Sequence, residues 1–114
     1  MSILDVLKRN WKKALALPEV KREEIRLTVR ENQTLAKLER LEKEKEEIFA
    51  RGAKIKAPSR RRQLARVYEM KADGMKMLER ELTLVSKELT TLSAIKLALE
   101  RRALAKDGIQ RLLH

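Results

Sequence analysis

The chain has 114 residues, of which 39% are charged and only 3% aromatic. Three glycines and two prolines are too few for the frequent turns of a β-sandwich or barrel, and 43% hydrophobic residues are too many for a disordered chain. The formal net charge of +11 favours anionic partners, either nucleic acid or an anionic membrane. These values predict an all-α fold made of long helices.

The residue types that catalysis needs are scarce. The chain has no cysteine, and its single histidine is the last residue, His114. It also lacks a glycine-rich phosphate loop and a metal-ligand spacing. We therefore expect no enzymatic activity, no cofactor, no metal and no small-molecule substrate.

The sequence also contains no apolar run long enough to cross a membrane and no secretory signal at its start. We expect a cytoplasmic protein that is at most peripheral, at the inner face of a membrane.

Residues 1–18 are predicted to form a first, amphipathic helix that Pro18 ends. Its apolar side includes Trp11, and basic residues gather on the other side, which is typical of a helix lying in a membrane surface. The predicted membrane-binding residues are Ile3, Leu4, Leu7, Lys8, Arg9, Trp11, Lys12, Lys13 and Leu15. The alternative is a short helix packed on the rest of the chain, with Trp11 buried.

Residues 19 to about 50 are predicted to form a second helix. An apolar stripe recurs every seven residues, although a threonine interrupts it: Val20, Leu27, Thr34, Leu41 and Ile48. Residues 51–58 contain one glycine and one proline and are predicted to connect this helix to the next. The segment 51–66 has no acidic residue but seven basic ones, which we call the basic tip: Arg51, Lys54, Lys56, Arg60, Arg61, Arg62 and Arg66.

Residues 59 to about 106 are predicted to form a third helix with Ser59 as its N-cap and Gly108 as its stop, leaving 108–114 as a tail. Steps of four and three give an apolar seam, interrupted at Lys71 and Lys96 and ending at Ala103. The predicted seam residues are Leu64, Tyr68, Met75, Leu78, Leu82, Val85, Leu89, Leu92 and Leu99. Asp73 and Gly74 lie inside this helix, as a tolerated defect or as a hinge. Together the second and third helices predict an antiparallel hairpin over residues 19–107, with part of the longer arm's seam left unpaired.

This layout resembles the ESCRT-III superfamily, which includes phage-shock protein A and the vesicle-inducing protein in plastids. The likeness is greatest in RRRQLARVYEMKADGMKMLERELTLVSKELTTLSAIKLALE, residues 60–100, with its basic start followed by Leu and Val heptads. The resemblance implies subunits that polymerise into rods, rings or spirals on anionic membranes and remodel or protect them. In that family further helices usually follow the hairpin, and some members carry a C-terminal motif for an ATPase, whereas only IQRLLH follows Gly108 here. We therefore expect either an assembly that relies on hairpin packing alone or a minimal or truncated member, and disassembly by an ATPase is in doubt.

Two other functions stay open. A coiled-coil adaptor or assembly factor would hold one protein partner along the seam and would not bind lipid. A basic coiled coil that binds nucleic acid is less favoured, because aromatic residues for stacking on bases are nearly absent.

Overall fold

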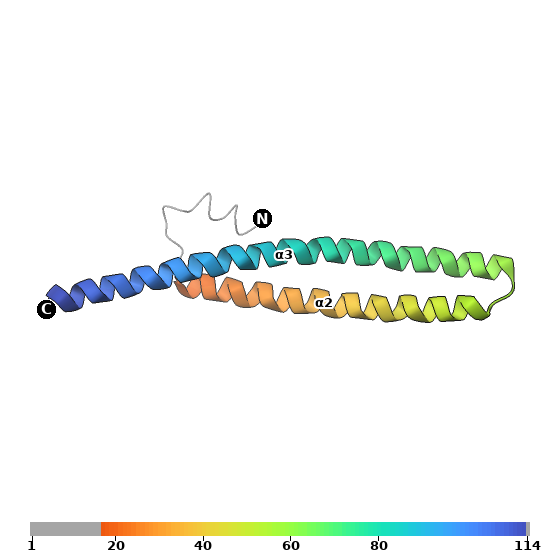
Figure 1. Cartoon of the computed structure of the whole chain (residues 1–114), viewed down its shortest axis with the longest axis horizontal. Helices are drawn as coiled ribbons and strands as arrows, with labels where there is room; N and C mark the ends of the chain where they lie inside the picture. Colours follow the sequence, from red (N-terminus) through yellow and green to blue (C-terminus); the bar gives the residue numbers. More distant parts are fainter. Residues whose placement is uncertain (1–16, 114) are drawn as a thin grey trace. The chain divides into compact units, whose positions relative to one another are not determined.

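The computed structural model describes residues 17–113, and these form two helices, α2 (Leu17–Lys54) and α3 (Pro58–Leu113) (Figure 1). The predicted all-α class is confirmed. The predicted membrane-binding residues of the first helix, from Ile3 to Leu15, lie outside the described residues.

The connection between the helices is shorter than predicted. Residues 55–57 replace the expected segment 51–58, because Gly52 stays helical and α2 continues to Lys54. The amide of Ile55 donates to the carbonyl of Gly52 at 3.3 Å and closes the end of α2. Arg51 and Lys54 occupy the last turn, where cations interact favourably with the helix dipole.

Both prolines lie at helix starts, and both shift a predicted boundary. Pro18 is the second residue of α2, so this helix begins at Leu17 instead of residue 19. Pro58 opens α3, and the amide of Arg61 donates to the carbonyl of Ala57 at 3.1 Å. Ala57 therefore precedes the helix, and the prediction of Ser59 as N-cap is wrong. The physical reason is that proline has no N–H to lose in a first turn and has its φ already set for a helix.

The predicted stop at Gly108 is also wrong, because α3 continues to Leu113. No glycine among the described residues has a positive φ, the conformation in which glycine usually ends a helix. One glycine costs a helix only about 1 kcal/mol, and the alanines and leucines around Gly108 favour helix. Residues 108–113 are thus part of α3, whereas they were expected to form a tail.

The described residues fall into two compact units. The first combines residues 17–30 of α2 with residues 85–113 of α3. Its core consists of four buried side chains, Val20, Leu27, Val85 and Leu92, against which Leu89, Ile95 and Leu99 pack. The ammonium of Lys96 donates to Glu24 at 3.0 Å. Residues 101–113 are all exposed, so the seam of this unit ends near Leu99 and does not include Ala103.

The second unit, residues 31–84, is a helical hairpin in which residues 55–57 join the two arms. Lys71 of α3 donates to Glu44 of α2 at 2.7 Å. Three residues later on α3, Gly74 lies opposite Leu41, which is three residues earlier on α2 than Glu44. Partners whose numbers change in opposite directions show that the two arms are antiparallel. Thr34 and Ile48 are buried, and the predicted seam residues from Leu64 to Leu82 are half-buried.

Gly74 faces Leu41 of α2 within this unit. A Cβ built there would lie 3.6 Å from the Cδ1 of Leu41, which is an ordinary contact distance. The backbone remains helical through Asp73 and Gly74. The small residue therefore occupies a packed position in the hairpin.

Candidate functional site

The basic tip surrounds the turn of the hairpin. All seven of its side chains are exposed: Arg51, Lys54, Lys56, Arg60, Arg61, Arg62 and Arg66. Only three residues separate α2 from α3, so the last turn of α2 and the first turns of α3 bring their charges to one end of this unit. The sequence run thus becomes one cationic surface.

Few of these charges are neutralised locally. The guanidinium of Arg51 lies 3.9 Å from the carboxylate of Glu47, and both side chains are mostly exposed. Arg62 donates weakly to the carbonyl of Pro58, at 3.4 Å. Within residues 17–113 the other five basic residues have no ion-pair partner, and the first turn of α3 contains no acidic residue. The positive end of the α3 dipole therefore adds to the cationic surface instead of being compensated.

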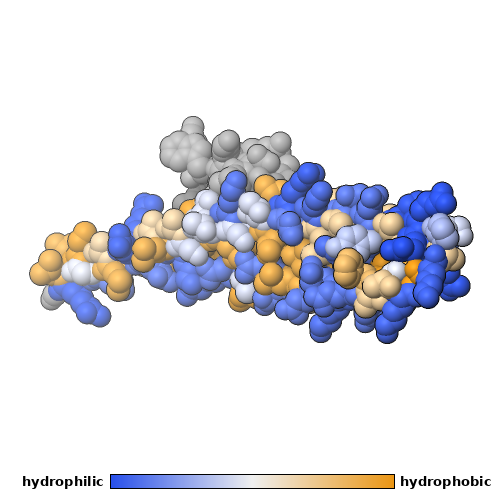
Figure 2. All heavy atoms as spheres, turned by 45° about the vertical axis from the view of Figure 1, so that its right-hand side comes forward, coloured by the Kyte–Doolittle hydropathy of each residue, from blue (hydrophilic) through white to orange (hydrophobic). Residues whose placement is uncertain are grey.

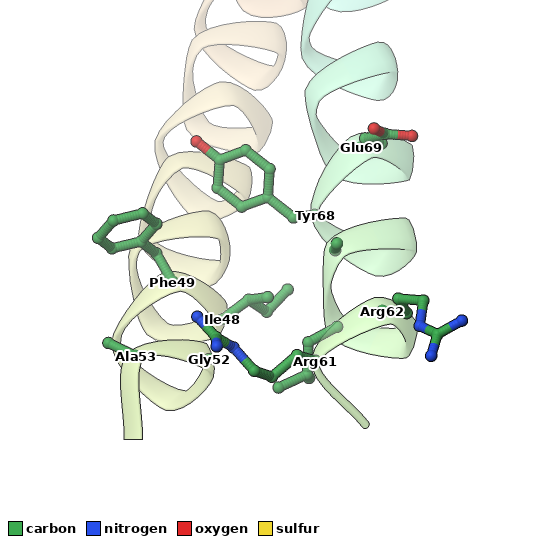
Figure 3. A pocket seen from close by; sticks show the side chains of 10 residues that line it. Ile48, Phe49, Gly52, Ala53, Arg61, Arg62, Tyr68 and Glu69 are labelled. Carbon is green, nitrogen blue, oxygen red and sulfur yellow. The ribbon is translucent and has the colours of Figure 1, made fainter. Parts of the chain in front are cut away.

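An open groove of about 730 Å³ lies next to the basic tip, between the ends of the two arms (Figure 3). Tyr68 and Arg61 both extend from α3 towards α2, whereas Arg62 and Glu69 point away from it. The lining residues are mostly apolar: Ile48, Phe49, Gly52, Ala53, Arg61, Arg62, Leu64, Ala65, Tyr68 and Glu69. The groove combines apolar walls with the guanidinium group of Arg61, a mixture suited to an amphiphile with an anionic head.

Two aromatic residues line this groove, and they differ in exposure. Phe49 is 71% exposed. Tyr68 is half-buried, and the ammonium of Lys45 lies 5.1 Å from the centre of its ring. Such a cation–π contact holds Tyr68 against α2, while Phe49 stays available to a ligand or a surface.

The predicted seam residues lie between the arms of their units and not at the tip. Met75, Leu78 and Leu82 are half-buried in the hairpin unit, as are Leu89 and Leu99 in the other unit, where Val85 and Leu92 are buried. They hold the helices together, and only Leu64 and Tyr68 also line the groove.

Some exposed apolar residues were not singled out from the sequence. Met70, Met77 and Leu84 recur every seven residues on α3, and Leu104, Ile109, Leu112 and Leu113 lie near its end. Figure 2 shows apolar surface interspersed with hydrophilic residues, including near the C-terminal end of α3. The seven-residue spacing was visible in the sequence, but only the position of the main seam shows that these side chains face solvent.

Comparison with known protein families, with characterised proteins and with solved structures finds no match. Neither α2 nor α3 has an apolar stretch sufficient to cross a bilayer. Residues 17–113 also contain no group of His, Cys, Asp or Glu side chains that could hold a metal ion.

Proposed function

We propose that this chain is an ESCRT-III-like peripheral membrane protein that self-assembles into polymers on anionic membranes, for membrane remodelling or protection. The observation that carries the proposal is the basic tip, with seven exposed cations and no acidic residue between positions 51 and 66. The predicted amphipathic helix at residues 1–18 would add a second contact with the same surface.

The tip suits an anionic membrane better than a single small anion. Its charges are spread over the end of one helix, a short connection and the start of the next, so they match a field of lipid headgroups. Each basic residue near such a surface contributes about 1 kcal/mol. Phe49, exposed beside the arginines, is an apolar side chain that can enter the headgroup region.

The end of α3 offers a further amphipathic surface. At about 100° per residue, Leu104, Ile109, Leu112 and Leu113 fall within one half of the helix circumference, and Lys106 and Arg111 lie at the two borders of that half. All six side chains are exposed. Basic residues that border an apolar face are typical of helices in a membrane surface.

A coiled-coil adaptor is the second candidate. It is favoured by the exposed apolar side chains of α3 outside the seam, such as Met70 and Met77, which a partner helix could cover. An adaptor would form a discrete complex with a different protein and would not depend on anionic lipid.

The tip can be tested by removing three of its charges. We expect Arg60→Gln, Arg61→Gln and Arg62→Gln together to weaken binding to phosphatidylserine-containing vesicles by about a hundredfold, from about 1 kcal/mol per charge. Co-sedimentation over a range of vesicle concentrations measures the change. Vesicles of phosphatidylcholine alone carry no net charge, so the tip should bind them neither in the unmodified chain nor in the triple variant.

A matched triple variant controls for net charge. Lys37, Lys43 and Lys76 are exposed and lie in the same unit but away from the tip, so changing all three to Gln removes the same three positive charges. We expect this control to lose much less affinity. Equal losses in the two triple variants would contradict a specific role for the tip, and tighter binding to duplex DNA than to vesicles at the same salt concentration would favour a nucleic-acid binder.

A further inference from the structure

A second apolar line runs along α3 outside the seam. Met70, Met77 and Leu84 are 72%, 69% and 61% exposed and are spaced by seven residues. Met70 and Met77 each precede a seam position by one residue, Lys71 and Leu78, which places them about 100° around the helix. All three lie in the hairpin unit, and we call them the outer stripe.

The outer stripe is an apolar line on α3 that no other described helix covers. Three large apolar side chains spaced by seven on one helix fill one of the two apolar positions that each heptad of a coiled-coil contact has. Charged residues border the outer stripe on one flank, where Asp73 and Arg80 are exposed. Neither of these two forms an ion pair within residues 17–113.

We propose that the outer stripe binds the outer stripe of a second copy of this chain, antiparallel and centred on Met77. In this register Met77 packs on Met77 of the second copy, and Met70 packs on Leu84. Because equivalent flanks face each other in an antiparallel pair with two-fold symmetry, Asp73 lies beside Arg80 of the second copy, and Arg80 beside Asp73. The apolar line and its flanking charges are thus complementary to themselves.

Charge complementarity favours a second copy of the chain over an anionic surface as the partner of the outer stripe. A second copy supplies the missing partner of Asp73 and of Arg80 at the same time, which a plain anionic surface cannot do because it would repel Asp73. Arg66, on the same flank, lies towards one end of the contact, where its long side chain can turn to solvent. The inference rests on the self-assembly in the proposed function and names one of its interfaces.

The register can be tested by disulfide trapping, since the chain has no cysteine of its own. Met77→Cys places one thiol on the proposed two-fold axis, so mild oxidation with copper phenanthroline should link two copies. Met70→Cys alone and Leu84→Cys alone should link poorly, whereas a mixture of the two should link efficiently. Ile25→Cys, at an exposed apolar position in the other unit, is the control that should not link above background.

The energetic test uses sedimentation velocity without lipid. We expect Met77→Glu to weaken self-association by about tenfold or more, since it buries a carboxylate in the contact. Asp73→Arg and Arg80→Asp should each weaken it by about threefold, and the double variant should recover, because the swapped charges again face opposite charges. Ile25→Glu should behave as the unmodified chain.

Several results would overturn the proposal. These are a chain that stays monomeric, equal linking of Met77→Cys and Ile25→Cys, or a double charge variant no better than the single ones. Stripe-dependent association together with no binding to anionic vesicles would leave this interface standing and refute the membrane function. Vesicle binding without association through the outer stripe would refute this interface and leave the membrane function standing.

Discussion

At the scale of single residues, two lysines occupy positions where the seam predicts apolar side chains. Lys71 donates to Glu44 at 2.7 Å and Lys96 to Glu24 at 3.0 Å, each on the facing helix of its own unit. All four side chains remain about a quarter to a third exposed, so solvent screens both pairs and each contributes little to stability. A slip of one heptad would separate both pairs. Their main effect is therefore to specify the register of the helices.

The pair between Lys96 and Glu24 makes stability depend on alkaline pH. The hydrogen bond to Glu24 raises the pKa of Lys96 above its ordinary 10.5, the charge of Glu24 adds to this, and burial opposes it. A raised pKa means that the folded state binds the proton more tightly than the unfolded state. The stabilisation is complete below 10.5 and is lost as the pH rises through the raised value.

Lys96→Gln should remove this part of the pH dependence. We expect the urea midpoint of the unmodified chain to fall more steeply above pH 10.5 than that of the variant, with the two curves parallel at lower pH. Lys87→Gln, which changes an exposed lysine on the same helix, should keep the full dependence. An unchanged alkaline slope in Lys96→Gln would show that the pair does not contribute.

At the scale of the helices, heptad spacing predicted the packing correctly and local signals misplaced the ends. Val20, Leu27, Thr34 and Ile48 are all buried as their spacing of seven requires, and Leu41 is half-buried. Many residues contribute to this periodicity, so one polar residue does not hide it. A helix end depends on one or two residues, and Pro58 and Gly108 fit both a break and a continuing helix. Long helices with good helix formers on both sides favoured continuation.

The difference between seam and surface can be measured on one helix. Leu92 is fully buried and Leu97 is 48% exposed, and both lie on α3 in the same unit. Leu92→Ala should lower the free energy of unfolding by about 2–5 kcal/mol, because it leaves a cavity in the core. Leu97→Ala should lower it by less than about 1 kcal/mol. Urea denaturation followed by circular dichroism measures both, and equal losses would contradict the assigned seam.

At the scale of the whole molecule, the sequence identified one candidate surface and missed another. The basic tip could be predicted, because charge is visible in composition and a short run of breakers placed it at a turn. The outer stripe could not, because Met70 and Met77 differ from seam residues only in the direction they face. The folded chain provides that direction through the contact of Lys71 with Glu44 on α2.

These surfaces have different roles in the proposed function. The basic tip and the end of α3 carry charge and apolar area suited to an anionic membrane, and the outer stripe is suited to another copy of the chain. Each contact is small, so we expect weak binding by one molecule and strong binding by an assembly, in which many contacts act together. Membrane binding should therefore rise steeply with protein concentration.

The most direct measurement is co-sedimentation of the full chain with anionic and with neutral liposomes, with the pellets imaged by negative-stain electron microscopy. Trp11→Glu, which places a charge in the predicted membrane-binding helix, is measured alongside. We expect binding to anionic vesicles only, with rods or coats on their surface, and a marked loss in the variant. Discrete soluble particles with no preference for anionic lipid would contradict the membrane function and favour the coiled-coil adaptor.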